Sequence, residues 1–169
     1  RKRVGTTLVG KWTIERLLGV GGMAAVYAAR HRNAHTAALK ILHRELSCDD
    51  ALRTRFLREG YAANTVGHPG AVRVLDDDVA DDGSVFLVME LLEGETLDAR
   101  ARRRPGGVLS TGDVLWIADR LLDVLVAAHA KGIVHRDIKP ENLFMTKSQE
   151  IKVLDFGIAR MLETASAAA

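Results

Sequence analysis

Short runs of alternating apolar and polar residues in the first half of the chain predict β-strands. The predicted strands cover residues 12–18, 26–29, 36–42, 71–75 and 84–90. Glycines separate the first two runs, so we expect a flexible glycine turn between these strands. An acidic turn over residues 76–83 separates the last two strands.

A helical pattern lies between the third and fourth predicted strands. It runs from about Ala51 to Thr65, and Asp49 or Asp50 is the expected N-cap. Its apolar spacing predicts which side chains face a core. They are Leu52, Phe56 and Ala63.

The pattern changes after Glu90. Gly94 marks a short connection, and two helical patterns follow it. The second is long, with an apolar side from Val114 to Ala130 and with Ser110 or Thr111 as its cap. Because one helix accompanies the strands and further helices follow, we predict an α+β fold of two lobes with a hinge at residues 90–94.

Composition is typical of a soluble globular protein, with 47% hydrophobic and 27% charged residues. The net charge is +2, which gives no argument for nucleic-acid binding. A basic cluster, Arg100 with residues 102–104, is interpreted as a solvated helix end. Cys48 is the single cysteine, so no internal disulfide can form and a reducing cytoplasmic compartment fits. No apolar run reaches the roughly 18 residues that a membrane span needs.

Two charged residues mark a first candidate site. Lys40 lies in the apolar strand sequence Ala37-Ala38-Leu39-Lys40, where a buried ammonium needs a partner. Glu59 on the predicted helix is the candidate partner. The glycine segment from Gly19 onward lets the backbone approach phosphate oxygens and tolerates unusual dihedral angles.

The strongest signal is His135-Arg136-Asp137-Ile138-Lys139-Pro140-Glu141-Asn142, followed by Asp155-Phe156-Gly157 after an apolar strand. A carboxylate in such a loop can orient an attacking hydroxyl and accept its proton. An amide oxygen and a second carboxylate suit Mg²⁺, which prefers oxygen ligands.

These motifs resemble the protein-kinase family, and most closely its bacterial eukaryotic-like Ser/Thr kinases, whose usual glycine loop is Gly-x-Gly-Gly-Met-Gly-x-Val-Tyr. The resemblance runs from about Trp12 to Arg160. It implies a protein-kinase-like fold: an N-terminal antiparallel sheet lobe with one helix, then an incomplete, mainly helical C-terminal lobe. The implied parts are an N-terminal extension (1–11), the N-lobe and hinge (12–93) and a partial C-lobe (94–169).

The resemblance also implies roles for single residues. Lys40 would hold the α- and β-phosphates of ATP and pair with Glu59. Asp137 would be the catalytic base, or would orient the substrate hydroxyl. Lys139, the Ser/Thr-kinase marker, would face the γ-phosphate. The implied Mg²⁺ ligands are Asn142 and Asp155. The implied nucleotide contacts are Gly19, Val20, Gly21, Gly22, Val26, Ala38, Lys40, Met89, Glu90, Leu92 and Leu143. His135 and Phe156 resemble packing members of the hydrophobic spine.

Two departures from the family pattern bear on these expectations. Ala24 replaces the third loop glycine, and alanine disfavours a positive φ by roughly 1–2 kcal/mol. Such a dihedral would weaken loop closure while nucleotide binding is retained. Nothing after Gly157 matches the Ala-Pro-Glu signature, and the chain begins with Arg1, so we interpret it as a piece of a longer protein. Without further helices, we expect the apolar side of residues 114–130 to be uncovered and the segment to be marginally stable and catalytically poor.

The function implied by the resemblance is transfer of the ATP γ-phosphoryl group to Ser or Thr hydroxyls of proteins, in the cytoplasm or on the cytoplasmic part of a membrane-anchored kinase. Autophosphorylation belongs to the same expectation, and Arg136 is the candidate partner of a phosphate in the following loop. Thr164 and Ser166 are candidate sites, but we interpret them as ordinary residues of an exposed tail. Three alternatives stay open at this point. They are an ATP-binding pseudokinase scaffold, a small-molecule phosphotransferase of kinase-like fold, and a non-enzymatic interaction fragment.

Overall fold

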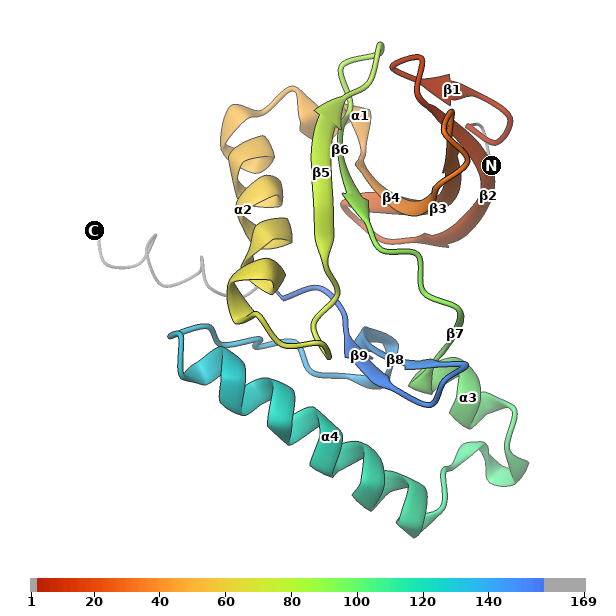
Figure 1. Ribbon diagram of the computed structural model, residues 1–169, viewed down its shortest axis with the longest axis vertical. Helices are drawn as coiled ribbons and strands as arrows, with labels where there is room; N and C mark the ends of the chain where they lie inside the picture. Colours follow the sequence, from red (N-terminus) through yellow and green to blue (C-terminus); the bar gives the residue numbers. More distant parts are fainter. Residues whose placement is uncertain (1–2, 157–169) are drawn as a thin grey trace. The chain divides into compact units, whose positions relative to one another are not determined.

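The computed structural model describes residues 3–156 of the 169-residue chain (Figure 1). Within this range the chain forms two compact units. The first consists of residues 3–58 and 73–92, and the second of residues 59–72 and 93–156. Each unit has its own cluster of buried hydrophobic side chains.

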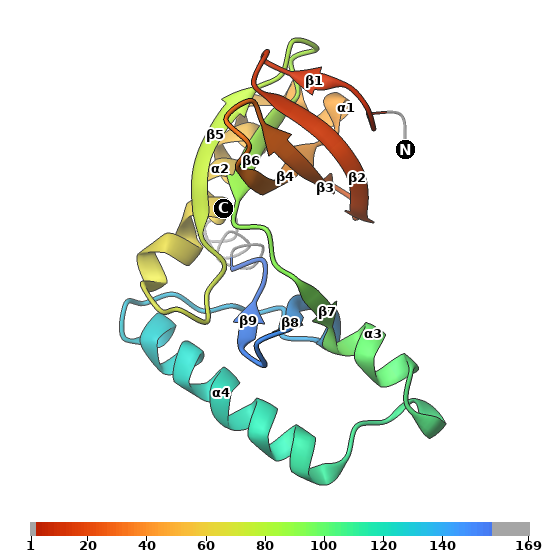
Figure 2. The same cartoon turned by 45° about the vertical axis from the view of Figure 1, so that its right-hand side comes forward.

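The first unit is built on a six-stranded antiparallel sheet with the strand order β1-β2-β3-β4-β6-β5. Its strands are β1 Thr7–Leu8, β2 Trp12–Val20, β3 Ala24–His31, β4 Thr36–Leu42, β5 Val74–Val79 and β6 Val85–Met89. Strands β1 to β4 curve together in both ribbon views (Figures 1 and 2). The central strands are rich in buried residues, and Ile14, Leu39 and Phe86 are among the most deeply buried side chains of this unit.

The N-terminal segment is part of this sheet, which the sequence pattern did not predict. Strand β1 pairs with β2, where Leu8 lies opposite Trp12 and is buried. Arg3 forms an ion pair of 2.6 Å with Asp82 and donates a second hydrogen bond to Ser84. A strand of two residues is too short to produce a visible alternation of apolar and polar positions.

The predicted acidic turn is wrong at its start. Asp76, Asp77 and Asp78 lie inside β5, and this strand begins at Val74, three residues after the predicted start at Ala71. Strand β5 is at the edge of the sheet. An edge strand tolerates charged side chains because water reaches them, so composition alone did not reveal a strand here.

Two helices follow β4. They are α1 Arg44–Ser47 and α2 Asp50–Val66. Asp49 caps the start of α2, because its Oδ1 accepts hydrogen bonds from the backbone N–H groups of Ala51 and Leu52. Residues 50–58 of α2 belong to the first unit and residues 59–66 to the second. Phe56 and Ala63 are buried as predicted, whereas Leu52 is only partly buried.

The second unit combines a three-stranded antiparallel sheet, in the order β7-β8-β9, with two helices. Its elements are β7 Gly94–Thr96, α3 Leu97–Arg102, α4 Thr111–His129, β8 Leu143–Thr146 and β9 Ile151–Val153. Short 3₁₀ turns cover Pro105–Gly107 and Pro140–Asn142. Helix α4 runs alongside the small sheet (Figure 2). Ser110 is its N-cap, as predicted, and its Oγ accepts a hydrogen bond from the N–H of Asp113.

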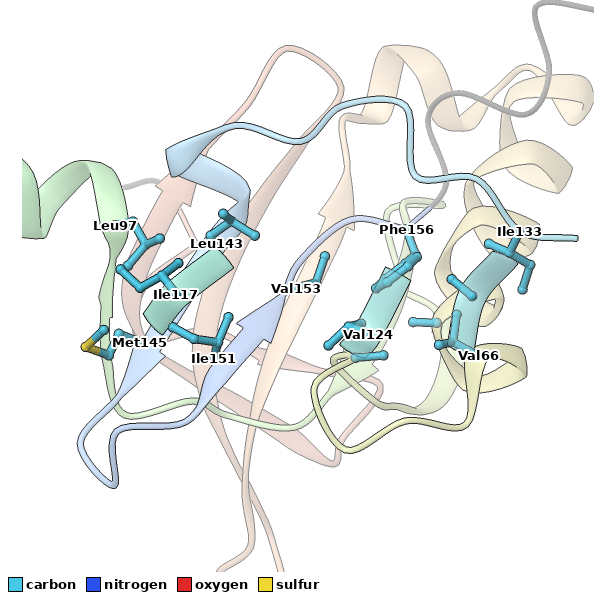
Figure 3. Close-up of a cluster of buried hydrophobic side chains, with 13 residues drawn as sticks. Val66, Leu97, Ile117, Val124, Ile133, Leu143, Met145, Ile151, Val153 and Phe156 are labelled. Carbon is cyan, nitrogen blue, oxygen red and sulfur yellow. The ribbon is translucent and has the colours of Figure 1, made fainter. Parts of the chain in front are cut away.

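The core of this second unit lies between α4, the small sheet and the C-terminal end of α2 (Figure 3). Val124 of α4, Val153 of β9 and Phe156 are each at most 2% exposed. The loop after α2 reaches the same core at Gly70. A Cβ there would lie 2.4 Å from Val124 Cγ2, so only glycine fits without displacement.

Helix α4 has a second, uncovered apolar side. Leu115, Leu122 and Val126 are 66%, 59% and 68% exposed. The sequence predicted this exposure. Among residues 3–156 no helix is long and apolar enough to span a membrane.

The basic cluster lies at the end of α3, and its arginines pair with carboxylates. Arg100 and Arg103 contact Glu95, while Arg102 contacts Asp98 at 3.1 Å. The interpretation of this cluster as a solvated helix end therefore agrees with the structure.

Candidate functional site

The hairpin of β8 and β9 brings two predicted metal ligands to the same end of the small sheet. Leu143 pairs with Val153, so Asn142, just before β8, and the residues just after β9 leave the hairpin together. The backbone N–H of Leu154 donates to the carbonyl oxygen of Asn142 at 2.8 Å. Asp155 follows directly, which places both oxygen-bearing side chains at this end.

Asp137 is held by its two neighbours in the loop. The Nζ of Lys139 lies 2.8 Å from Asp137 Oδ2. Asn142 donates through Nδ2 to both the backbone oxygen and Oδ2 of Asp137, at 2.8 and 2.9 Å. The carboxylate is 34% exposed, so it remains open to a ligand on one side.

The charges in this loop stabilise one another. The hydrogen bond from Lys139 is the main cause that lowers the pKa of Asp137; burial opposes it, and the hydrogen bond from Asn142 adds to it. The same hydrogen bond raises the pKa of Lys139. Asp137 is therefore an ionised carboxylate and Lys139 an ammonium at neutral pH.

The side chain of His135 is only 1% exposed, and its ring contacts the backbone at two points. Its Nε2 lies 2.7 Å from the oxygen of Leu154, which can only accept a hydrogen bond. Its Nδ1 accepts from the backbone N–H of Asp137 at 3.3 Å. A neutral ring with the proton on Nε2 satisfies both contacts. The ring of Phe156 packs edge-on against the ring of His135, with 4.9 Å between the two ring centroids. The predicted packing role of these two residues therefore agrees with the structure.

Two residues of the candidate site have strained backbone dihedral angles. Arg136 has a φ of 62° and Asp155 a φ of 54°, although neither is glycine. Such dihedrals cost about 1–3 kcal/mol each and are typical of functional sites. They turn the chain immediately before Asp137 and at Asp155 itself.

In the first unit, predicted nucleotide contacts share one face of the sheet. Val26 lies directly opposite Lys40, and Ala38 lies directly opposite Met89. Lys40 and Ala38 are two positions apart on β4. Opposite residues of antiparallel strands, and residues two apart on one strand, project from the same face. One face of β3, β4 and β6 therefore has a small apolar surface with Lys40 beside it.

In the glycine turn between β2 and β3, the expected effect of Ala24 on the backbone is not found. Ala24 is the first residue of β3, pairs with Leu42, and does not have a positive φ. Gly19, Gly21 and Gly22 also lie outside the positive-φ region. Alanine at position 24 therefore has no dihedral strain in this conformation. The turn is instead contacted by His43, which the sequence did not single out.

The remaining predicted residues are divided between the units. Glu90 belongs to the first unit, where its Oε1 accepts from the backbone N–H of Arg73 at 2.8 Å, and Leu92 ends that unit. Lys40 belongs to the first unit and Glu59 to the second, so their pairing stays a prediction. Gly157, Thr164 and Ser166 lie outside the described residues.

The residues of the loop fit a hard cation. Asn142 donates through Nδ2 to Asp137, so the end of its amide that can bind a cation is the oxygen Oδ1. The carboxylate of Asp155 supplies further oxygen, and oxygen donors are what Mg²⁺ prefers. Among residues 3–156 there is no group of three or more His, Cys, Asp or Glu side chains that could hold a metal ion.

The family model for the protein kinase domain matches residues 12–169. The chain belongs to the protein kinase family. Its sequence is 38% identical over 167 residues to serine/threonine-protein kinase pkn3 of Myxococcus xanthus, covering 95% of this chain and 30% of that protein. It is 37% identical over 168 residues to serine/threonine-protein kinase PknA of Mycobacterium tuberculosis, covering 96% of this chain and 38% of that protein.

Solved kinase structures show the same fold. The crystal structure of the Mycobacterium tuberculosis PknI kinase domain matches with a TM-score of 0.75 at 34% identity, covering 98% of this chain and 68% of that one. The predicted kinase family and the protein-kinase-like fold are therefore confirmed. The chain spans well under half the length of the curated kinases pkn3 and PknA.

Proposed function

We propose that this chain transfers the γ-phosphoryl group of Mg-ATP to Ser or Thr hydroxyls of proteins. The observation that carries the proposal is the fixed carboxylate of Asp137, which Lys139 and Asn142 hold at 2.8 and 2.9 Å. Phosphoryl transfer needs little covalent help from the protein, and positioned groups supply most of the catalysis.

Asp137 orients the substrate hydroxyl and accepts its proton. As the hydroxyl oxygen bonds to the γ-phosphorus, the bond from that phosphorus to the bridging oxygen breaks and ADP leaves. The lowered pKa of Asp137 keeps it unprotonated at neutral pH, so it orients the hydroxyl first and accepts a proton late. Lys139 lies beside it as a fixed positive charge for the transferred group.

Other residues bind the nucleotide in this proposal. Lys40 contacts the α- and β-phosphates, and the apolar surface formed by Val26, Ala38 and Met89 accepts the base. Asn142 and Asp155 hold Mg²⁺, which when bound neutralises phosphate charge. The glycine turn, the hinge residues Glu90 and Leu92, and Leu143 complete the proposed contacts.

The scaffold alternative loses one of its arguments. It depended partly on Ala24 weakening the glycine turn, and Ala24 lies in an ordinary strand conformation. The relatives pkn3 and PknA are named serine/threonine-protein kinases. We therefore favour a phosphotransferase of low turnover in this segment alone, whose substrates are proteins, itself included, and which acts in the cytoplasm.

Asp137→Asn tests the proposal. It keeps the shape of the side chain and removes the proton acceptor, so phosphate transfer from radiolabelled ATP to a generic protein should fall about 10²–10⁴-fold. Asp119→Asn, an exposed aspartate on α4, is the matched control and should keep the parent rate. An unmodified chain that binds Mg-ATP yet transfers no phosphate, even to itself, would contradict the proposal.

A further inference from the structure

His43 ties the glycine turn to the end of β4. Strands β3 and β4 pair as far as Ala24 opposite Leu42. One residue further, the backbone N–H of His43 donates to the carbonyl oxygen of Met23 at 2.8 Å. The ladder between the two strands therefore continues into the turn itself.

The side chain of His43 reaches further along the same turn. Its Nε2 lies 2.9 Å from the carbonyl oxygen of Gly21. A carbonyl oxygen only accepts hydrogen bonds, so the imidazole donates through Nε2–H. The turn is closed by a third bond, from the N–H of Gly21 to the oxygen of Ala24 at 2.8 Å. Two of these three bonds come from His43.

The turn depends on such contacts because its glycines bring no side chains. A Cβ at Gly19 or Gly22 would meet nothing within 4 Å, and one at Gly21 would meet only the oxygen of Ala24. Glycine also loses the most conformational entropy when it is ordered. A donor from outside the turn therefore has a large effect on how often the turn is in its closed geometry.

His43 is itself well anchored. Its carbonyl oxygen accepts from the N–H groups of Leu46 and Ser47, and also from Ser47 Oγ at 3.1 Å. Ser47 is 4% exposed, and its Oγ accepts from the N–H of Val85 in β6 at 3.4 Å. The imidazole is thus held by the start of α1 and by the sheet, three residues after Lys40.

We propose that His43 is a positioning residue that holds the glycine turn in its closed geometry and thereby raises the affinity for the phosphates of a nucleoside triphosphate. The phosphate part rests on the proposed function. The holding of the turn does not, because it follows from contacts within the first unit.

Three variants test the two parts separately. His43→Phe keeps a ring and removes the donor, His43→Gln keeps an N–H donor, and His35→Phe is the matched control on the exposed turn before β4. The first readout is hydrogen exchange of the Gly21 amide without nucleotide. We expect it to become about three- to tenfold faster in His43→Phe, the loss of one net hydrogen bond, and to stay near the parent value in the other two.

The second readout is the dissociation constant for ATP and for adenosine. His43→Phe should weaken ATP binding about three- to tenfold and leave adenosine binding unchanged, since adenosine has no phosphate. If His43→Phe does not fold, His43→Ala takes its place with the same readouts.

The outcomes separate the two proposals. Unchanged Gly21 exchange in His43→Phe overturns the positioning role, whatever the nucleotide results. Faster exchange with unchanged ATP affinity overturns its link to phosphate binding. If the parent chain binds no ATP, the proposed function fails while the exchange measurement still decides on His43.

Discussion

The carboxylate of Asp137 has neighbours of two chemical kinds, the ammonium of Lys139 and the amide of Asn142. Both lower the pKa of Asp137 through hydrogen bonds, and the bond from Lys139 is the larger cause. The positive charge of Lys139 lowers this pKa further, whereas Asn142 is uncharged. Replacing one of these neighbours at a time separates the two effects.

Lys139→Met removes the ammonium and retains much of the side-chain volume. The pKa of Asp137 should rise toward its ordinary value, because the largest cause of its lowering is lost. Carboxyl-carbon NMR across an acid titration measures this directly. Lys147→Met is the control: it pairs with Glu93 at 2.8 Å, and its loss should raise the pKa of Glu93 and leave Asp137 unchanged.

The lowered pKa of Asp137 determines how the stability of the fold depends on pH. A carboxyl whose folded pKa is lowered stabilises the fold above its unfolded pKa and loses this contribution as the pH falls through the folded value. The stability of Lys139→Met should therefore depend less on pH in the acidic range than that of the parent chain. An Asp137 titration identical in both proteins would contradict the assigned cause.

Residues with a strong motif were predictable at this scale, and residues with a spatial role were not. Asp137, Lys139 and Asn142 occur in one short segment, so their proximity follows from the chain itself. His43 meets Gly21 only because β3 and β4 pair in one register. No periodicity marks a histidine just after a strand. The concern over Ala24 depended on a dihedral angle that composition cannot reveal.

At the start of β7, the backbone of β8 lies so close that it leaves no room for a side chain. Gly94 begins β7 with a φ of 149°, and a Cβ there would lie 2.0 Å from the carbonyl oxygen of Met145 in β8. That atom is part of the sheet backbone and cannot move aside without disturbing the pairing of β7 with β8.

Gly94→Ala should therefore destabilise the second unit by about 1–3 kcal/mol from the strained dihedral, with the steric contact adding to it. Gly112→Ala is the control, because a Cβ at Gly112 meets nothing within 4 Å in α4. It should be neutral or up to about 1 kcal/mol stabilising. Urea unfolding of both variants measures the difference, and equal stabilities would show that β8 yields at Gly94.

Long elements were predictable from sequence, and so was the short apolar strand β9 before Asp155, but two other short strands were not. The capped helices α2 and α4 begin close to where Asp49 and Ser110 predicted. Strands β1 and β7 have two and three residues, too few for a periodic signal. They form because longer partners, β2 and β8, offer free hydrogen-bonding edges to them. Such strands are a tertiary property and not a local one.

At the scale of the molecule, residues 3–156 contain two separate clusters of buried hydrophobic side chains, one in each unit. Leu39 belongs to the cluster of the first unit and Ile133 to that of the second. Both are at most 5% exposed. Separate cores permit separate opening, since a local loss of packing has its first effect on the unit that contains it.

Leu39→Ala and Ile133→Ala should each cost about 2–5 kcal/mol in their own unit. Native-state hydrogen exchange should then show faster exchange mainly in strands β3, β4 and β6 for the first, and mainly in α4, β8 and β9 for the second. Leu115→Ala on the uncovered side of α4 serves as the control and should change little. Uniform acceleration across both units in either core variant would mean that the chain opens as a whole.

The two-part organisation was predictable because strands precede helices along the chain. The boundary within α2 was not, since a continuous helix gives no sign of where its packing partners change. Glu59 falls on the second side of that boundary. For this reason its predicted partnership with Lys40 depends on both units and not on either sequence segment alone.

The two margins of the large sheet differ in a way that bears on self-association. One margin, β1, is only two residues long and gives an intruding strand little to pair with. The other, β5, is longer and exposes Leu75, but it carries three consecutive aspartates. A second copy approaching this margin in register would bring like charges together, so the aspartates of β5 discourage fibre-like stacking there.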